Sequence, residues 1–181
     1  MSKVYTFRNK EAVYFTTDTV VGWIDLFTRK ELRQIVVESL RYCQANKGLQ
    51  IHGWCLMSSH LHMLISCTGL EISEVMRSFK THTSKRMTEW IEQNPESRKE
   101  WLLNRFQYEG ANLKRISKYK VWQDGSHAEE CPRMWDMMQT KLDYIHQNPV
   151  VAEIVSEPEH YLYSSARDYS GGKGLLEISF I

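Results

Sequence analysis

Apolar side chains along the first fifty residues change from strand-like to helix-like spacing. Residues 12–17 are rich in β-branched and aromatic types, which is typical of a β-strand. Apolar side chains then recur every three to four residues, as a helix requires, at Leu32, Ile35, Val36 and Leu40. Thr28 followed by Glu31 resembles a capping box at the start of this helix, and Gly48 is a typical stop signal at its end.

Two apolar runs follow directly, over residues 49–57 and 60–66. Only Ser58 and Ser59 separate them, so a short turn would join two neighbouring strands. The pattern therefore predicts a β-hairpin over residues 49–66.

The second half of the chain is less regular. A second helix fits the spacing from Ile72 to about Glu92, and residues 96–118 are too polar to assign. Residues 119–123 resemble a fourth strand, and residues 133–147 a third helix that the pair Asn148-Pro149 would stop.

The predicted order is therefore β-α-β-β-α-β-α, and its first six elements match the split βαβ, ferredoxin-like pattern. We expect an α+β fold with an antiparallel sheet and helices on one face, followed by a C-terminal helix and tail. Residues 1–150 would form the main domain. Residues 151–181 would be a tail that packs on or extends the same domain.

Composition narrows the function classes. The 181 residues are 42% hydrophobic and 25% charged, a globular balance with a net charge of only +1, so any nucleic-acid surface must come from local clusters. No signal peptide or membrane span is evident. Four cysteines lack any CxxC pair, which favours reduced thiols in a cytoplasmic protein; they are Cys43, Cys55, Cys67 and Cys131.

His60 and His62 stand two residues apart at the start of a predicted strand. Side chains at i and i+2 of a strand share a face, so both imidazoles can bind one metal ion. Two half-buried structural histidines are an equally good explanation of this pair in isolation. The very apolar strand that follows favours the ion, because two adjacent rings there need a polar partner.

Tyr144 and Asn148 are four residues apart on the last predicted helix and therefore share a face. A phenol can act as a nucleophile, and an amide oxygen is a suitable ligand for Mg²⁺ or Mn²⁺. The ordinary alternative is that Tyr144 packs and Asn148 caps the helix before Pro149.

These pieces together resemble the HUH superfamily of single-strand DNA endonucleases, and within it the single-tyrosine transposases of the insertion-sequence 200 type. The REP-associated tyrosine transposases are the most similar branch. The resemblance spans roughly residues 10–170. It depends on WCLMSSHLHMLI at residues 54–65, VWQ at 121–123 and LDYIHQNPV at 142–150.

The resemblance implies a ferredoxin-like catalytic domain in which His60, His62 and Asn148 bind Mg²⁺ or Mn²⁺ and Tyr144 is the nucleophile. Tyr144 would attack single-stranded, hairpin-bearing DNA and form a 5′-phosphotyrosine, and a later 3′-hydroxyl would complete DNA transposition. Asn148, where related transposases often carry Gln, points to the REP-associated branch. Many relatives have Pro-Asn where this chain has Ser58-Ser59, which changes the turn and leaves the ligands in place.

Basic residues beside aromatic ones suit a single strand of DNA. The best single candidate is Lys80, in a position that resembles a helix motif of the family, and His127 resembles a family position near the tyrosine helix. For any other basic residue alone, a solvated surface is the commoner role. The remaining candidates are Arg77, Lys85, Arg86, Lys114, Arg115, Lys118 and Lys120.

Two alternatives stay open at the level of sequence. The same fold serves as a non-catalytic module that binds single-stranded DNA or RNA, which would need no metal. A metal-dependent hydrolase with a purely structural Tyr144 is the other. The resemblance is compatible with a monomer or a homodimer.

Overall fold

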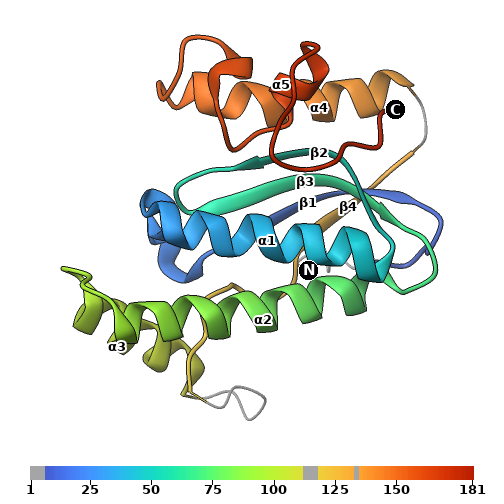
Figure 1. Cartoon of the computed structure of the whole chain (residues 1–181). Coiled ribbons are helices and arrows are strands. Elements are labelled where there is room, and N and C mark those ends of the chain that lie inside the picture. Colours follow the sequence, from blue (N-terminus) through green and yellow to red (C-terminus); the bar gives the residue numbers. More distant parts are fainter. Residues whose placement is uncertain (1–6, 112–117, 133–134) are drawn as a thin grey trace, which may run out of the picture.

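A four-stranded antiparallel sheet forms the centre of the molecule in the computed structural model, which describes residues 7–111, 118–132 and 135–181 (Figure 1). The strands lie in the order β2-β3-β1-β4. Their bounds are Val13–Thr19 for β1, Leu49–Leu56 for β2, His60–Cys67 for β3 and His127–Cys131 for β4. This confirms the expected α+β fold, and the strand order is that of the split βαβ pattern.

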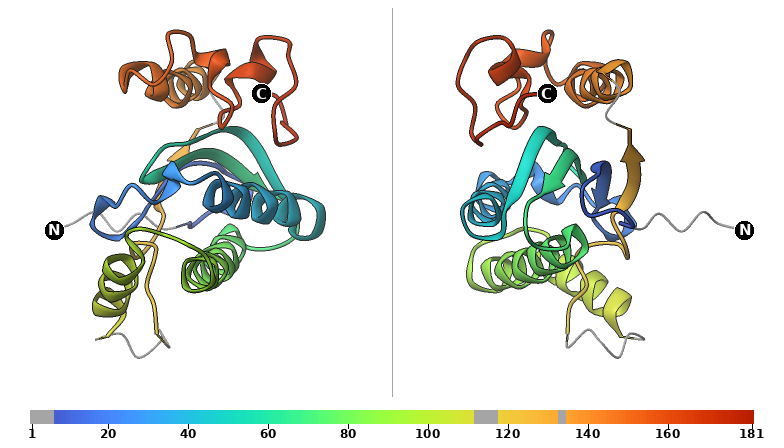
Figure 2. Two further views of the ribbon diagram at one scale, coloured as in Figure 1. Left: turned by 60° about the vertical axis from the view of Figure 1, so that its left-hand side comes forward. Right: turned by 90° about the vertical axis from the view of Figure 1, so that its right-hand side faces the viewer.

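Helices lie on both faces of this sheet (Figures 1 and 2). Helices α1 (Lys30–Lys47) and α2 (Ile72–Gln93) cover one face. Helix α4 (Trp135–Val151) and the short α5 (Ala166–Tyr169) lie over the other. Helix α3 (Lys99–Gly110) contacts α2. The described residues also include three short 3-10 helices: η1 (Val21–Trp23), η2 (Leu26–Thr28) and η3 (Pro158–His160).

The two layers follow from the alternation of side chains along the strands. Tyr14 and Met63 belong to the large core beneath α1 and α2. Their neighbours Phe15 and Leu64 belong to a second, smaller core that includes Leu142 of α4. The sheet is therefore apolar on both faces, as its almost continuously buried strands β2 and β3 require.

The C-terminal segment follows the outer edge of β2. Tyr163 accepts a backbone hydrogen bond from Leu56, and Ser165 donates one to Trp54. Further along, Ser179 donates to Ile51. The tail thus covers an edge that would otherwise present unpaired backbone groups. The division of the chain at residue 150 stays a prediction.

The fourth strand was predicted in the wrong place. Residues 119–123 form only an isolated bridge, between Trp122 and Val20, whereas β4 pairs with β1 farther along the chain. Strand β4 (HAEEC) lies at the sheet edge, and only Ala128 and Cys131 are buried in it. A polar edge strand carries no run of apolar residues, so its pattern gave no signal.

One helix lies in a stretch that the sequence left unassigned, and two helix boundaries differ from the predictions. Helix α3 lies within the unassigned residues 96–118. Helix α4 continues past Pro149 to Val151. A proline in the last turn removes only one helical hydrogen bond, and the Pro149 side chain is buried. Thr28 does not cap α1, because it belongs to η2 and its hydroxyl donates to the carbonyl of Asp25.

Candidate functional site

His60 and His62 open strand β3 and present their rings to the sheet face that α4 covers. The ring centroids are 4.7 Å apart. Across the strand pair, His62 lies opposite Thr17 of β1, and its Nδ1 is 2.9 Å from the Thr17 hydroxyl. The Ser59 hydroxyl is 3.1 Å from Nδ1 of His60. A polar contact on Nδ1 of each ring leaves both Nε2 atoms available to a ligand.

Burial keeps both rings neutral. Desolvation lowers the pKa of His62 to about 3, and the neighbouring His60 contributes to this shift. Burial also lowers the pKa of His60. The Asn148 amide is close enough to oppose part of the shift on His62, yet Nε2 of His62 is buried without a hydrogen-bond partner. A buried nitrogen in this state is costly unless something binds it.

Helix α4 brings Tyr144 and Asn148 to the same histidines. The Tyr144 ring packs edge-on against His62, with 5.3 Å between the centroids, and against Phe15 at 5.7 Å. Its side chain nevertheless stays 52% exposed, so a substrate can reach the phenol. One turn later, the Asn148 amide nitrogen donates to the carbonyl of Tyr144 at 2.6 Å. This bond directs the amide along the helix face that carries Tyr144.

The donor set of this site fits a divalent cation. Neutral imidazoles and an amide oxygen are suitable ligands, and the unpartnered Nε2 of His62 is a vacant donor atom. Within the described ranges, no group of three or more His, Cys, Asp and Glu side chains could hold a metal. A metal site here would therefore combine the two histidines with a ligand of another type, such as the amide oxygen of Asn148.

Two basic clusters that are far apart in the sequence meet in one groove of about 990 Å³. Helix α2 forms one wall, and the segment 118–126 forms the other. Besides Tyr119 and Trp122, the groove is lined by Arg77, Lys80, Lys85, Lys118 and Lys120. The structure thus brings together five of the predicted DNA contacts beside the partly exposed Tyr119, whereas Trp122 is only 4% exposed and belongs to the core.

The other predicted DNA contacts lie elsewhere. Arg86 lines a separate hollow between α1 and α2, and Lys114 and Arg115 fall outside the described residues. His127 is exposed at the start of β4. Thr17 pairs with both His127 and His62, so the three side chains form a row on one sheet face, roughly 10 Å from end to end.

Lys80, the best single candidate from the sequence, is held inside the fold. Its ammonium lies 3.0 Å from Oδ1 of Asp18, whose side chain is fully buried, and it also donates to the carbonyl of Gly125. The Ser126 hydroxyl donates to the same Asp18 oxygen at 2.6 Å. Lys80 therefore ties α2 to the sheet, and its role in DNA binding stays a prediction.

The groove and the histidine site lie on opposite faces of the sheet. Thr17 and Asp18 are neighbours on β1 and point to opposite sides. Thr17 contacts His62 on the face of α4, and Asp18 contacts Lys80 on the face of α2. The alternation of one strand thus separates the two regions.

Sequence reasoning missed three residues around the histidines. Phe15 stacks on His62 at 5.7 Å, Thr17 contacts its ring, and Trp23 meets His60 edge-on at 5.5 Å. The first two depend on the register between β1 and β3, which a single sequence does not reveal. Trp23 is exposed, and both it and Gly22 have a positive φ, a combination that no sequence pattern indicates.

Comparisons with known proteins agree with this architecture. Residues 24–111 match the model of a family described as IS200-like transposases. A solved structure of a REP-associated tyrosine transposase bound to a REP hairpin superposes with a TM-score of 0.62 at 19% identity, over 100% of this chain and 92% of that chain.

Among curated proteins, no sequence matches this chain. None of the helices in the described part of the chain is long and apolar enough to cross a membrane. The recognition drawn from the sequence is confirmed to this extent: residues 24–111 match the model of IS200-like transposases, and the fold is that of a solved REP-associated tyrosine transposase.

Proposed function

We propose that this protein cuts and rejoins single-stranded, hairpin-bearing DNA through a covalent bond to Tyr144. One observation carries the proposal. The ring centroid of the half-exposed Tyr144 lies 5.3 Å from that of the buried His62, whose Nε2 has no hydrogen-bond partner. A nucleophile beside a vacant donor atom is the arrangement that phosphoryl transfer needs. The IS200-like family match supports the same reaction class.

His60, His62 and Asn148 would hold Mg²⁺ or Mn²⁺, which when bound supplies Lewis-acid neutralisation of the scissile phosphate. The phenol oxygen of Tyr144 attacks the phosphorus as its proton is lost. The bond from phosphorus to the 3′ oxygen breaks, and that oxygen leaves as a 3′-hydroxyl after taking up a proton. The products are a 5′-phosphotyrosine and a free 3′ end.

The same side chains support the reverse step. Because the phosphotyrosine keeps the energy of the phosphodiester, a 3′-hydroxyl from another strand can attack it and release Tyr144. No nucleotide cofactor is needed. Phe15 packs against both Tyr144 and His62, so it limits the movement of the phenol relative to the histidines between the two steps.

The hairpin would bind outside the chemical site. The structurally similar transposase is bound to a REP hairpin, and the groove between α2 and residues 118–126 offers this chain a basic, aromatic surface for DNA. Phosphate contacts there would position the DNA, whereas the face of α4 would carry out the reaction.

The experiment is a covalent-adduct assay. The protein is incubated with an end-labelled REP-type DNA hairpin with single-stranded flanks and Mn²⁺, and adducts are separated by denaturing electrophoresis. We expect a labelled adduct that EDTA abolishes and that is absent from Tyr144→Phe. Tyr108→Phe is the matched control, since Tyr108 is an exposed tyrosine on α3, and it should form adduct like the wild type.

An equal adduct yield from Tyr144→Phe and wild type would sink the tyrosine mechanism. Binding of the hairpin without any adduct, unaffected by His60→Ala, would instead favour a non-catalytic nucleic-acid module.

A further inference from the structure

Trp23 occupies a backbone conformation that tryptophan rarely adopts. Its φ is +56°, in the left-handed region, and it follows Gly22 at +63°. A bulky side chain in this region is strained, and such strain persists only where surrounding contacts impose it. The side chain is also 63% exposed, so burial of its own ring does not compensate the strain.

Backbone hydrogen bonds fix the segment around Trp23 from both sides. Val20 donates to Ser59 in the turn before His60, and Val21 donates to Val121. After Trp23, Phe27 donates to Ser58 in the same turn. The segment 20–27 is therefore fastened to the turn that precedes the first histidine.

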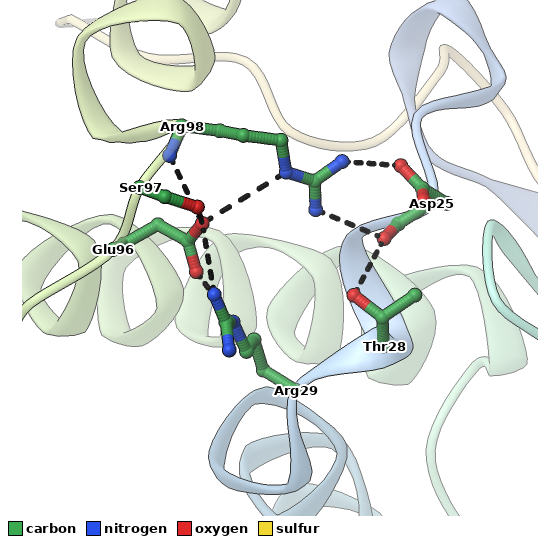
Figure 3. Close-up of polar contacts among 6 residues, drawn as sticks. All are labelled: Asp25, Thr28, Arg29, Glu96, Ser97 and Arg98. Carbon is green, nitrogen blue, oxygen red and sulfur yellow. Dashed lines mark hydrogen bonds and ion pairs between the residues drawn. The ribbon is translucent and has the colours of Figure 1, made fainter.

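A charged network holds the far end of this segment (Figure 3). Arg98 donates to Asp25 at 2.5 Å, and Arg29 donates to Glu96 at 2.7 Å. Glu96 is 1% exposed at its side chain, and its hydrogen bond with Arg29 lowers the pKa of the carboxyl. Asp25 and Arg29 thus fasten the segment to the connection between α2 and α3.

This rigid frame places the Trp23 ring beside the chemical site. The centroids of Trp23 and His60 are 5.5 Å apart, and the rings meet at 69°, so the indole is not stacked on the imidazole. On the neighbouring residue, a β-carbon built at Gly22 would lie 3.5 Å from Nη2 of Arg105. The Arg105 guanidinium, paired with Glu109 at 2.8 Å, remains 43% exposed at its side chain.

We propose that Trp23 is a stacking platform for an unpaired base next to the scissile phosphate. An exposed indole beside the histidines offers a flat apolar surface. Arg105 adds a cation next to Gly22, the residue that precedes Trp23. Aromatic rings with adjacent cations are the usual means of holding single-stranded nucleic acid. Trp23 is thus a positioning residue, which orients the strand for attack by Tyr144, and the inference rests on the function proposed above.

The test separates stacking from a structural role. Trp23→Gly removes the ring and relieves the strain, because glycine adopts positive φ freely. Trp23→Phe retains an aromatic ring. Tyr42→Ala is the matched control, since it removes an exposed aromatic side chain on α1.

Affinity is measured by fluorescence anisotropy in a Tyr144→Phe background, for a REP-type hairpin with single-stranded flanks and for its blunt stem alone. Each flank position in turn carries 2-aminopurine, whose fluorescence is quenched when the base stacks. Thermal melting of each variant is recorded in parallel.

We expect Trp23→Gly to bind the flanked hairpin about tenfold more weakly and the blunt stem equally well. One 2-aminopurine position should lose its quenching, Trp23→Phe should recover much of both signals, and Tyr42→Ala should match the parent. The melting temperature of Trp23→Gly should be unchanged or higher.

Equal affinity and equal quenching in Trp23→Gly would overturn the inference, as would a weaker affinity accompanied by a lower melting temperature. These results are distinct from a failure of the proposed function, which would appear as no Tyr144 adduct in the wild type.

Discussion

The candidate residues on the two faces of the sheet differ in whether the fold supplies their partners. On the face of α4, burial holds His60 and His62 neutral, and one nitrogen of His62 is left unsatisfied. On the face of α2, two lysines of the groove are paired within the protein, Lys80 with Asp18 and Lys118 with Glu92. Oδ2 of Asp18 is itself buried without a hydrogen bond, so the contrast concerns the candidate residues: Lys80 has a partner inside the fold, and Nε2 of His62 has none.

This difference indicates which residues serve the fold and which serve a ligand. Folding favours structures in which buried polar groups find partners, so a buried exception needs an explanation. His62 is such an exception next to Tyr144, the proposed nucleophile, whereas Lys80 has its partner. The comparison therefore predicts that changes at the two sites affect different properties of the protein.

The largest effect is expected from His62→Ala. Loss of this proposed metal ligand should lower the rate of Tyr144 adduct formation by about a thousandfold, the equivalent of several kcal/mol of charge stabilisation in the transition state. The melting temperature should fall as well, because the substitution removes a buried ring that packs on Phe15 and contacts the Thr17 hydroxyl, so rates are compared at a temperature where both proteins are folded. Quenched-flow adduct formation with Mn²⁺ measures the rate, differential scanning calorimetry measures the melting temperature, and calorimetric titration measures Mn²⁺ binding.

His52→Ala is the matched control. His52 is a buried histidine on β2 whose two ring nitrogens lie 2.7 Å from the Ser179 carbonyl and 2.8 Å from the Ser66 hydroxyl. Its loss should lower the melting temperature and leave the adduct rate of the folded protein unchanged. The assignment of His62 to the reaction and His52 to the fold would be wrong in either of two cases. His52→Ala would lower the adduct rate without lowering the melting temperature, or His62→Ala would keep the wild-type adduct rate.

Lys80→Met should act on stability. The substitution leaves the Asp18 carboxylate buried without its cation, which we expect to cost about 3 kcal/mol in the free energy of unfolding. Lys85→Met is the control within the same groove, since Lys85 is 75% exposed and its nearest ion pair, with Glu89, is 3.8 Å long. It should change stability by less than about 0.5 kcal/mol and weaken hairpin binding.

Urea unfolding and anisotropy measure these two quantities. The double variant Asp18→Asn, Lys80→Met removes both charges and should recover part of the lost stability. If Lys80→Met unfolds like the wild type while DNA binding collapses, Lys80 is a free DNA contact and the comparison between the faces fails.

Local patterns in the sequence predict the framework of this site. The hairpin over residues 49–66 and the strand alternation place His60 and His62 side by side. The spacing of Tyr144 and Asn148 places both on one helix face. Each of these inferences depends on residues close together in the chain, where the geometry of a strand or helix fixes the outcome.

The remaining features depend on contacts between distant segments. Asp18 decides the role of Lys80 although 62 positions separate them. Thr17 reaches His62 only through the register of β1 against β3. Trp23 acquires its conformation from bonds to turns and loops elsewhere in the chain. Only tertiary structure creates such contacts, so no local pattern announces them.

The smallest expected effect is a pH dependence of stability. Low pH should weaken the packing of α4 against the C-terminal segment by protonating His146. Its Nε2 lies 2.8 Å from the Ser165 hydroxyl, a contact between α4 and the C-terminal segment, and burial lowers its pKa to about 4.

The unfolded chain, with a histidine pKa near 6.5, binds this proton more readily than the folded protein does. The stabilisation is therefore complete above pH 6.5 and is lost as the pH falls toward 4. We expect His146→Gln to reduce the loss of unfolding free energy between pH 7.5 and 4.5 by on the order of 2 kcal/mol, measured by urea unfolding at both pH values.

His82→Gln, at an exposed histidine on α2, is the control and should behave as the wild type. His60 and His62 lie on the same face with lowered pKa values, so part of the acid sensitivity should remain in His146→Gln. A pH dependence equal to that of the wild type would mean that acid does not act through the contact between α4 and the tail.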